Sequence, residues 1–321
     1  MSDTPSPNTG ATENPPLRLS VVVASHSAPA QVMRCLESLQ AQRQDGIGEI
    51  ILVTADGRDV ADIVRQRFPS IDVVLRPGQA LTPELWGQGV LRSREAVIAL
   101  TTADMVPEPG WARALLTHYE REPWAAVGGV ILPTPDLGPL DAAIYWLRYH
   151  RFGPRMPAGA VRDIAGDNGS YRRDALGPYL DRISRDGFWE NELNQDLVAA
   201  GKALYLEPAA VVRYQGGESF GLFARQRLVH GRRFGIERFE RTSGLRRWLL
   251  LLAWPLTPAA LLTRVVRGAL AAQAVRSVIP ALLPLTGLVA CWSSGELLGY
   301  LAAAAHVRRR RPLAKPSAGA A

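Results

Sequence analysis

Two short acidic segments hold the side chains with the clearest chemical use in this sequence. Asp104 follows the apolar run 96–101 (AVIALT), and Glu190 and Glu192 stand at the start of a helical pattern. A carboxylate at the carboxyl end of a strand can bind a divalent cation such as Mn²⁺ or Mg²⁺, which in turn can hold a diphosphate. A carboxylate at the start of a helix can accept the proton of an attacking hydroxyl group. We therefore expect a metal ligand at Asp104 and a general base at Glu190; the alternatives are a cap for Asp104 and helix-dipole complements for both glutamates.

Alternating apolar runs and helical patterns predict the elements that position these acids. Strands that alternate with helices indicate an α/β domain with a mostly parallel sheet and flanking helices. The strands are expected at 19–24, 49–54, 71–75 and 96–101, and the helices at 30–41, 60–68 and 85–94. Ligands bind beyond the carboxyl ends of such strands, which here are Ser25–Ser27, Ala55–Arg58 and Thr102–Met105.

The pattern is less regular in the rest of this domain, which we expect to span 17–240. Further strands are expected at 127–132, 203–206 and 210–214, and a helix at 140–149. A Gly- and Pro-rich loop at 153–159 and a polar segment at 166–170 lie between them.

The composition changes to mainly apolar over 241–311, where we expect membrane-associated helices. The stretch 278–305 is long enough to cross a bilayer, which takes about 20 residues, whereas 248–263 is shorter and contains Pro255 and Pro258. The two stretches could cross as a hairpin or lie in the membrane interface. The alternative is a pair of core helices in a soluble domain, but neither stretch shows the polar face that such helices carry.

The distribution of charge favours a membrane surface over nucleic acid. The chain has 321 residues and a formal net charge of +7, and its arginines crowd around the C-terminal apolar stretches. Basic residues are not interleaved with aromatic ones, so we expect no nucleic-acid partner. In a hairpin, Arg308–Arg311 would lie on the cytoplasmic side, as the positive-inside rule requires, whereas Arg264, Arg267 and Arg276 would not.

The termini and the cysteines carry no catalytic signal. Residues 1–16 are rich in Ser, Thr and Pro and contain no apolar segment of a signal peptide, so we expect a disordered leader and a cytoplasmic catalytic domain at the cell membrane. A disordered tail is expected at 312–321. Cys35 and Cys291 have no metal-binding or redox spacing and are expected to be buried thiols.

The segment Thr102–Trp111 (TADMVPEPGW) resembles the D-x-D region of family 2 glycosyltransferases, in which an acidic pair precedes a P-x-P-G-W or similar run. Asp104 takes the position of the second acid, and Thr102 stands at the first. The resemblance covers roughly 19–235. It implies a GT-A fold in which a divalent metal on Asp104 binds the diphosphate of a nucleotide-sugar donor.

Two strand-end loops resemble the nucleotide-binding positions of that family. Ser25 and His26 follow the opening strand, which in the family usually ends in a proline, an aromatic residue and an asparagine; Ala24, His26 and Ser27 replace those here. Asp56 matches the second acid of the pair that follows the next strand, with Ala55 at the first. In the family this second loop contacts the base and the ribose, so we expect Asp56 to do so here. A plain Asp-Gly turn is the alternative.

The segment 189–193 (WENEL) resembles the family's E-D-x-[DE]-L motif, which carries the general base of an inverting transfer. Glu190 takes the place of the base, Trp189 that of the preceding acid, and Glu192 that of the later acid. We therefore expect all three residues to face the sugar.

Two further segments resemble parts of the family that border the substrates. The run 166–173 (GDNGSYRR) is similar to G-x-N-x-x-[YF]-R-R, which implies that Asp167 and Asn168 bind sugar hydroxyls; a polar turn is the alternative. Arg227 and Arg232 lie in a stretch similar to one in membrane-linked members, where such groups face the diphosphate or lipid headgroups. A solvated basic face is the alternative there.

The resemblance implies an inverting glycosyltransferase that moves a sugar from a nucleotide-diphosphate donor to a lipid-linked or polysaccharide acceptor. The departures at Ala55, Thr102 and Trp189 motivate an alternative, a catalytically degenerate, membrane-bound protein that binds nucleotide sugars as a scaffold. A sugar nucleotidyltransferase is a third hypothesis. It is disfavoured because the loop 25–29 lacks the basic, glycine-rich sequence of those enzymes.

Overall fold

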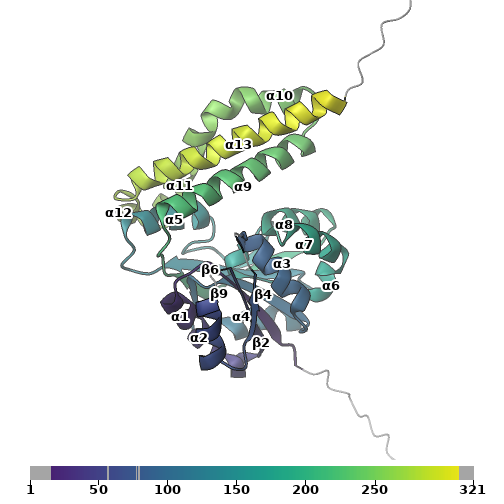
Figure 1. The fold of residues 1–321 in the computed structure, drawn as a ribbon, viewed down its shortest axis with the longest axis vertical. Helices are drawn as coiled ribbons and strands as arrows, with labels where there is room; N and C mark the ends of the chain where they lie inside the picture. The colour runs from purple at the N-terminus through teal and green to yellow at the C-terminus, as the bar shows by residue number, and fades with distance from the viewer. Residues whose placement is uncertain (1–15, 56–57, 77, 79, 311–321) are drawn as a thin grey trace, which may run out of the picture.

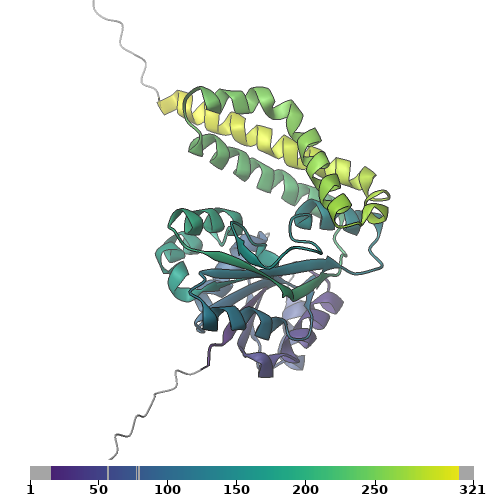
Figure 2. The ribbon, with the colours of Figure 1, turned by 180° about the vertical axis from the view of Figure 1, so that it is seen from behind.

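An α/β domain carries a layer of long helices on one side (Figure 1). The computed structural model describes residues 16–55, 58–76, 78 and 80–310. Apart from residue 16, the predicted leader and tail lie outside the described residues. Figure 2 shows the same layer of helices from behind.

The first half of the domain has the predicted parallel architecture. Three of its four strands are largely buried, because helices cover both faces of the sheet, whereas the edge strand is half-buried. Neighbouring strands in the order β3-β2-β1-β4 are all parallel. The strands are β1 (Leu19–Ser25), β2 (Ile47–Thr54), β3 (Asp72–Leu75) and β4 (Val97–Thr102), and the connecting helices are α1 (Pro29–Gln40), α2 (Arg58–Arg67) and α3 (Thr82–Arg92).

The second half makes the nine-stranded sheet mixed rather than mostly parallel. The order continues β4-β8-β6-β9-β5, with β8 antiparallel to both neighbours, β5 and β7 antiparallel to β9, and β6 parallel to β9. The two strands predicted at 203–206 and 210–214 form one strand, because an irregularity in its pairing with β6 accommodates the residues between them. The strands are β5 (Met105–Pro107), β6 (Ala126–Pro133), β7 (Gly159–Val161), β8 (Gly169–Arg172) and β9 (Leu204–Tyr214).

The remaining helices of the domain complete two apolar cores, one on each face of the sheet. One core includes Trp111, Tyr145 and Cys35, and the other includes Trp86 and Phe188. Cys35 is thus buried as predicted, whereas Cys291 is only half-buried. The helices are α4 (Trp111–Arg121), α5 (Pro139–Tyr149), α6 (Arg173–Leu176), α7 (Leu180–Asp186) and α8 (Glu190–Ala199).

The C-terminal layer consists of several helices rather than two simple spans. The first apolar stretch bends at Pro255, which lies in a 3₁₀ turn (Trp254–Leu256), and the second begins only after Pro280. By length and composition alone, 244–271 and 282–306 could each cross a membrane; the first is almost wholly exposed, and half of the second is buried. The helices are α9 (Phe220–Arg241), α10 (Gly244–Ala253), α11 (Thr257–Ala271), α12 (Val275–Val278) and α13 (Leu282–Arg310).

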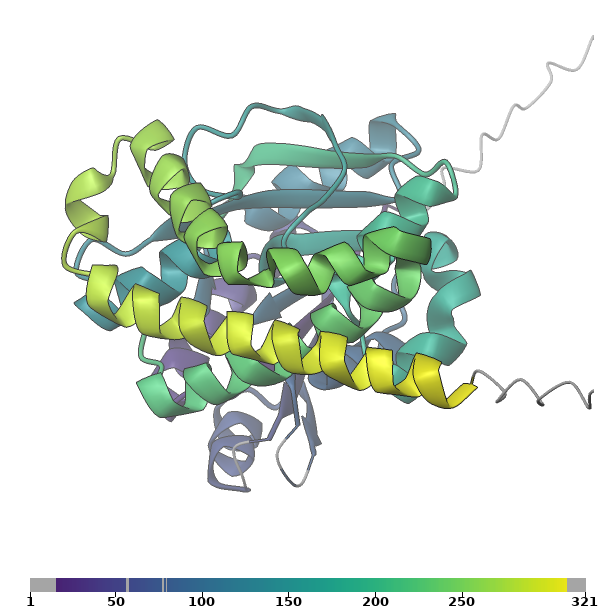
Figure 3. The same cartoon turned by 90° about the horizontal axis from the view of Figure 1, so that it is seen from above.

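Helix α13 lies directly against α9 through glycines on both helices (Figure 3). A Cβ atom on Gly231 of α9 would lie 2.3 Å from the carbonyl oxygen of Trp292, and one on Gly295 of α13 would lie 2.2 Å from that of Leu228. Gly235 and Gly299, each one turn further along, show the same contact. Because only glycine permits this approach of two backbones, α9 and α13 form one packed unit.

Candidate active site

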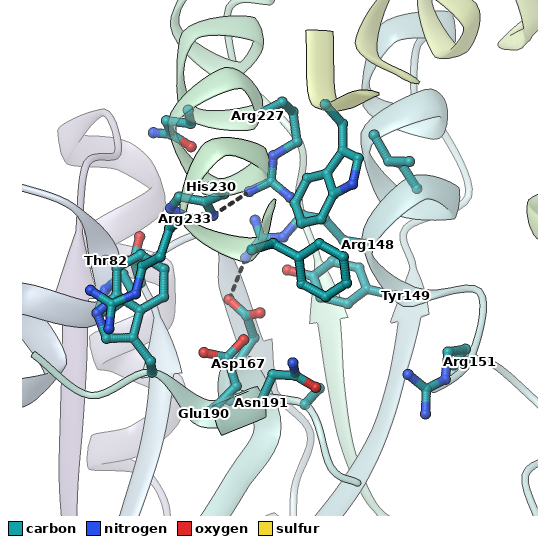
Figure 4. Close-up of a pocket in the computed structure, with 18 of the residues that line it drawn as sticks. Thr82, Arg148, Tyr149, Arg151, Asp167, Glu190, Asn191, Arg227, His230 and Arg233 are labelled. Atoms are coloured by element: carbon teal, nitrogen blue, oxygen red, sulfur yellow. Dashed lines mark hydrogen bonds and ion pairs between the residues drawn. The ribbon is translucent and has the colours of Figure 1, made fainter. Parts of the chain in front are cut away.

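A cavity of about 560 Å³ lies between the carboxyl ends of β1 and β4 and the C-terminal helices. His26, Asp104 and Glu190 line it from the α/β domain, and Arg227 and His230 line it from α9. Figure 4 shows Glu190, Arg227 and His230 in this cavity. The site is therefore built where strand ends meet the helical layer, at the edge of the sheet predicted from the alternating pattern.

A buried ion-pair group occupies the floor of this cavity. Nη2 of Arg148 donates to Oδ1 of Asp167 at 2.7 Å, and its Nη1 lies 4.0 Å from Oδ2 of Asp104. The hydroxyl of Thr102 also donates to Oδ1 of Asp167, at 3.1 Å. Burial raises the pKa of Asp104, and the Arg148 guanidinium opposes that rise. One cation thus serves two buried carboxyl groups.

Asp104 has the features of a ligand for a divalent cation. Its side chain is only 7% exposed, yet Oδ2 has no hydrogen-bond partner among the residues that the structure describes. Within the described part of the chain, no group of three or more His, Cys, Asp or Glu side chains is placed to hold a metal alone. Carboxylates that bind Mg²⁺ commonly share it with substrate phosphates and water. The residues present therefore fit a cation that arrives together with a diphosphate.

Glu190 is the first residue of α8, the helix start that the sequence predicts, and it lines the cavity. Figure 4 shows Glu190 and Asp167 side by side on the floor of the site. Burial, and next the charge of Asp167, raise the pKa of Glu190 to about 7. A carboxyl group with that pKa is about half ionised at pH 7 and can accept a proton there.

Trp189 and Glu192 are held by Arg233 of α9, a residue that the sequence analysis does not single out. Nε and Nη2 of Arg233 donate to the two oxygens of Glu192 at 2.9 and 3.2 Å. The Arg233 guanidinium also lies 3.9 Å from the centre of a Trp189 ring. Both predicted residues line the cavity, and their contacts with Arg233 tie α8 to the helical layer.

Arg227 is a buried cation in the wall of the cavity. Its Nη2 donates to Nδ1 of His230 at 3.1 Å, because a guanidinium has no acceptor, and this leaves the histidine proton on Nε2. Among the residues that the structure describes, no carboxylate pairs with Arg227. Burial and the charge of Arg148 lower its pKa to about 10. Burial and Arg227 likewise hold the pKa of His230 well below its usual value. Arg232, in contrast, is exposed and lies outside the cavity.

The remaining predicted residues differ in their positions. His26 lines the cavity, whereas Ser25 is buried behind it, where its Oγ accepts from the amide of Ser27 at 3.2 Å. Asp56 lies outside the described residues. The expectation that Asn168 binds sugar hydroxyls must be corrected. Its Oδ1 accepts from Trp111 at 2.7 Å, and its Nδ2 donates to two backbone carbonyls. With these groups engaged in the core, Asn168 joins strands rather than binding sugar hydroxyls.

Besides Arg233, the sequence analysis misses Arg148 and Glu218, two further charged residues that line the cavity. Arg148 lies in the last turn of α5, and a single basic residue in a mainly apolar helix is the signal that could have identified it. Glu218 lines the cavity just before α9, where burial and the charge of Asp104 raise its pKa to about 7. Nothing in the surrounding sequence distinguishes Glu218 from a residue of an ordinary loop.

Two comparisons with known protein sequences agree with this geometry. The family model of glycosyl transferase family 2 matches residues 20–180, half of the chain. A glucosyl-dolichyl phosphate glucuronosyltransferase of Haloferax volcanii is 30% identical over 192 residues, which cover 53% of this chain. The match spans 58% of that relative's length.

The architecture is likewise similar to that of a solved glycosyltransferase. The mannosyltransferase PcManGT of Pyrobaculum calidifontis, solved in complex with GDP-Man and Mn²⁺, is 16% identical with a TM-score of 0.50. The similarity covers 92% of this chain and 88% of that one, which supports a common GT-A-like fold. Because the family model spans the strands and loops that build the floor of the cavity, this chain belongs to glycosyl transferase family 2.

Proposed function

We propose that this protein catalyses an inverting glycosyl transfer from a nucleotide-diphosphate sugar to a lipid-linked acceptor at a membrane surface. The observation that carries the proposal is that Glu190 and Asp104 lie in one cavity that is also lined by apolar residues of the helical layer, among them Leu256 and Leu261. A base, a diphosphate site and an apolar entrance are the parts that such a reaction requires.

Glu190 is the proposed general base. Its carboxylate accepts the proton of the acceptor hydroxyl as that oxygen forms a bond to the anomeric carbon of the donor sugar. The bond from that carbon to the diphosphate breaks in the same step, so a single displacement inverts the anomeric configuration. The raised pKa of Glu190 makes it a stronger base than an exposed glutamate and leaves it about half ionised at neutral pH.

Asp104 and Arg227 are the proposed contacts to the diphosphate. When a divalent cation is bound, it neutralises negative charge that develops on the leaving diphosphate. Asp104 would hold that cation with its unpaired Oδ2. Arg227 is a buried guanidinium with no ion-pair partner in the described part of the chain, and an anionic substrate group would offset the cost of its burial.

The acceptor is proposed to enter from the side of the helical layer. Leu256, Ala260 and Leu261 line the outer part of the cavity next to Arg264. Apolar side chains beside an arginine suit a lipid chain that carries an anionic head. The name of the Haloferax volcanii relative, with its dolichyl phosphate, supports the same class of acceptor.

The helical layer is proposed to lie in the membrane interface rather than to cross the bilayer. Leu245, Leu252 and Leu256 are 70–77% exposed on the outer face of this layer. Helix α13 is in backbone contact with α9, which carries many charged residues. If α13 entered the bilayer core, it would bring the charged residues of α9 with it, which is costly. In this arrangement the catalytic domain lies on the cytoplasmic side.

Ligand-dependent thermal unfolding tests the function directly. The full chain in detergent would be mixed with UDP, GDP, dTDP or their sugars, with and without Mn²⁺. We expect one nucleotide to raise the melting temperature in a metal-dependent manner, because it binds the folded state, and Asp104→Ala to lose that rise. If no nucleotide raised the melting temperature, the proposed transfer would be refuted.

A further inference from the structure

We propose that Asp167 is the second carboxylate of the divalent-cation site, and that Arg148 holds Asp104 and Asp167 in place until a cation displaces it. The inference deepens the proposed function and rests on one part of it, the binding of a cation at Asp104.

The register of the sheet explains why Asp167 can take this role. Strands β4 and β8 are antiparallel, with Val97 opposite Arg172 and Leu100 opposite Gly169. Continued by two residues, this register places Thr102 opposite Asp167, and their side chains form the 3.1 Å hydrogen bond. Thr102 is the position at which the D-x-D pattern lacks its first acid. Asp167, just before β8, therefore supplies a carboxylate beside Thr102, where the first acid of the D-x-D pattern is missing.

The contacts of Arg148 mark the space between the two acids as a cation site. Its guanidinium donates to Asp167 at 2.7 Å and lies 4.0 Å from the unpartnered Oδ2 of Asp104. Both carboxylates are only 7% exposed, so each would be costly to bury without a nearby cation. Arg148 supplies that positive charge in the ligand-free protein.

A divalent cation and Arg148 cannot share this position without strong repulsion between like charges. Arg148 also lines the cavity, so its side chain has space to turn away from the two acids. A guanidinium released in this way would face the incoming diphosphate, with which it can form paired hydrogen bonds. Binding of the cation would thus replace the contact of Arg148 with the two carboxylates by a contact with the diphosphate.

Direct measurement of Mn²⁺ binding to the full chain in detergent tests the assignment without relying on activity. Free Mn²⁺ would be followed by electron paramagnetic resonance, with Mn²⁺ alone and with Mn²⁺ plus inorganic pyrophosphate. We expect Asp104→Asn and Asp167→Asn each to weaken binding by about tenfold or more, and Arg148→Gln to strengthen it. Asp163→Asn is the matched control, because Asp163 lines the same cavity but pairs with Arg151 at 3.1 Å. It should retain the wild-type affinity.

A carboxylate exchange separates a metal ligand from a merely structural acid. The double variant Thr102→Asp/Asp167→Asn moves the carboxylate from position 167 to the facing position 102. We expect this variant to recover the Mn²⁺ binding that Asp167→Asn loses. Melting temperatures without ligand would confirm that each variant is folded.

The possible failures are distinct. If Asp167→Asn bound Mn²⁺ as the wild type does while Asp104→Asn did not, Asp167 would not be a ligand. An unchanged affinity in Arg148→Gln would overturn the competition between arginine and metal. If the wild type bound nucleotide but no Mn²⁺, even with pyrophosphate, the cation site of the proposed function would itself be refuted.

Discussion

Arg148 at the end of α5 and Asp167 just before β8 are joined by a 2.7 Å ion pair in the floor of the site. The pair connects a helix that packs against the C-terminal layer with the strand that borders β4. The same contact therefore fixes the catalytic floor and links it to the helices that cover it.

Loss of Arg148 should destabilise the protein in a pH-dependent manner. Arg148→Met leaves two buried carboxylates without their cation, which costs about 3–5 kcal/mol for a buried pair. Burial already raises the pKa of Asp104, so this group stabilises the fold when protonated and loses that contribution as the pH rises through its folded-state pKa. Thermal unfolding at pH 5 and pH 8 should show the larger loss at pH 8. Equal losses at both values would contradict the charge argument, and adding Asp167→Asn should restore part of the stability.

Replacement of Glu190 should remove both the activity and its pH dependence. Only ionised Glu190 accepts a proton, and its pKa is about 7, so the transfer rate should rise with pH through that value. Glu190→Gln should lower kcat by about 10²–10⁴-fold while nucleotide binding is retained.

Glu192→Gln is the matched control for this experiment. Glu192 lies two residues away and is paired with Arg233. The transfer rate of Glu192→Gln should therefore still rise with pH on the acidic side, as in the wild type. A profile of Glu190→Gln with the wild-type acidic limb would show that another group is the base.

The contact between α9 and α13 should tolerate no side chain at its glycines. In Gly295→Leu, the new Cβ would lie 2.2 Å from the carbonyl oxygen of Leu228, so the helices must separate. Overpacking of this kind costs about 1–3 kcal/mol or more, and the melting temperature should fall. Gly221→Ala is the control, because no atom lies within 4 Å of its added Cβ. Equal melting temperatures for both variants would argue against the packed unit.

Exposed leucines of the helical layer should determine binding to vesicles. Leu252 and Leu256 are 77% and 70% exposed, and replacing both with serine should reduce co-sedimentation with anionic vesicles. Leu91→Ser is the control, because Leu91 is also exposed but lies on α3 of the α/β domain. Undiminished binding by the double variant would place the membrane contact elsewhere.

The orientation of the layer can be tested at the connection between α11 and α13. In Cys291→Ser/Arg276→Cys, an impermeant maleimide should label position 276 only from the side of the catalytic domain if the helices lie in the interface. Labelling from the opposite side would show that the helices cross as a hairpin.

Local patterns in the sequence determined the first half of the fold and the principal acids. Apolar runs separated by helical periods are local signals, so β1 to β4 were predicted within about two residues, and Glu190 was placed at a helix start. The resemblance in Thr102–Trp111 likewise identified the family, which the family model confirms.

Only the tertiary structure decided which charges meet in the site. The partners Arg148 and Asp167 lie on different elements, and Arg233 reaches Glu192 across 41 positions of the chain. Arg232 and Arg233 are neighbours in sequence, yet only Arg233 faces the cavity, because successive helical residues point in directions about 100° apart. Asn168 and Asp167 diverge in the same way, one into the core and one into the cavity. A sequence motif specifies residue types, whereas the direction of each side chain and its distant partner depend on how strands and helices pack.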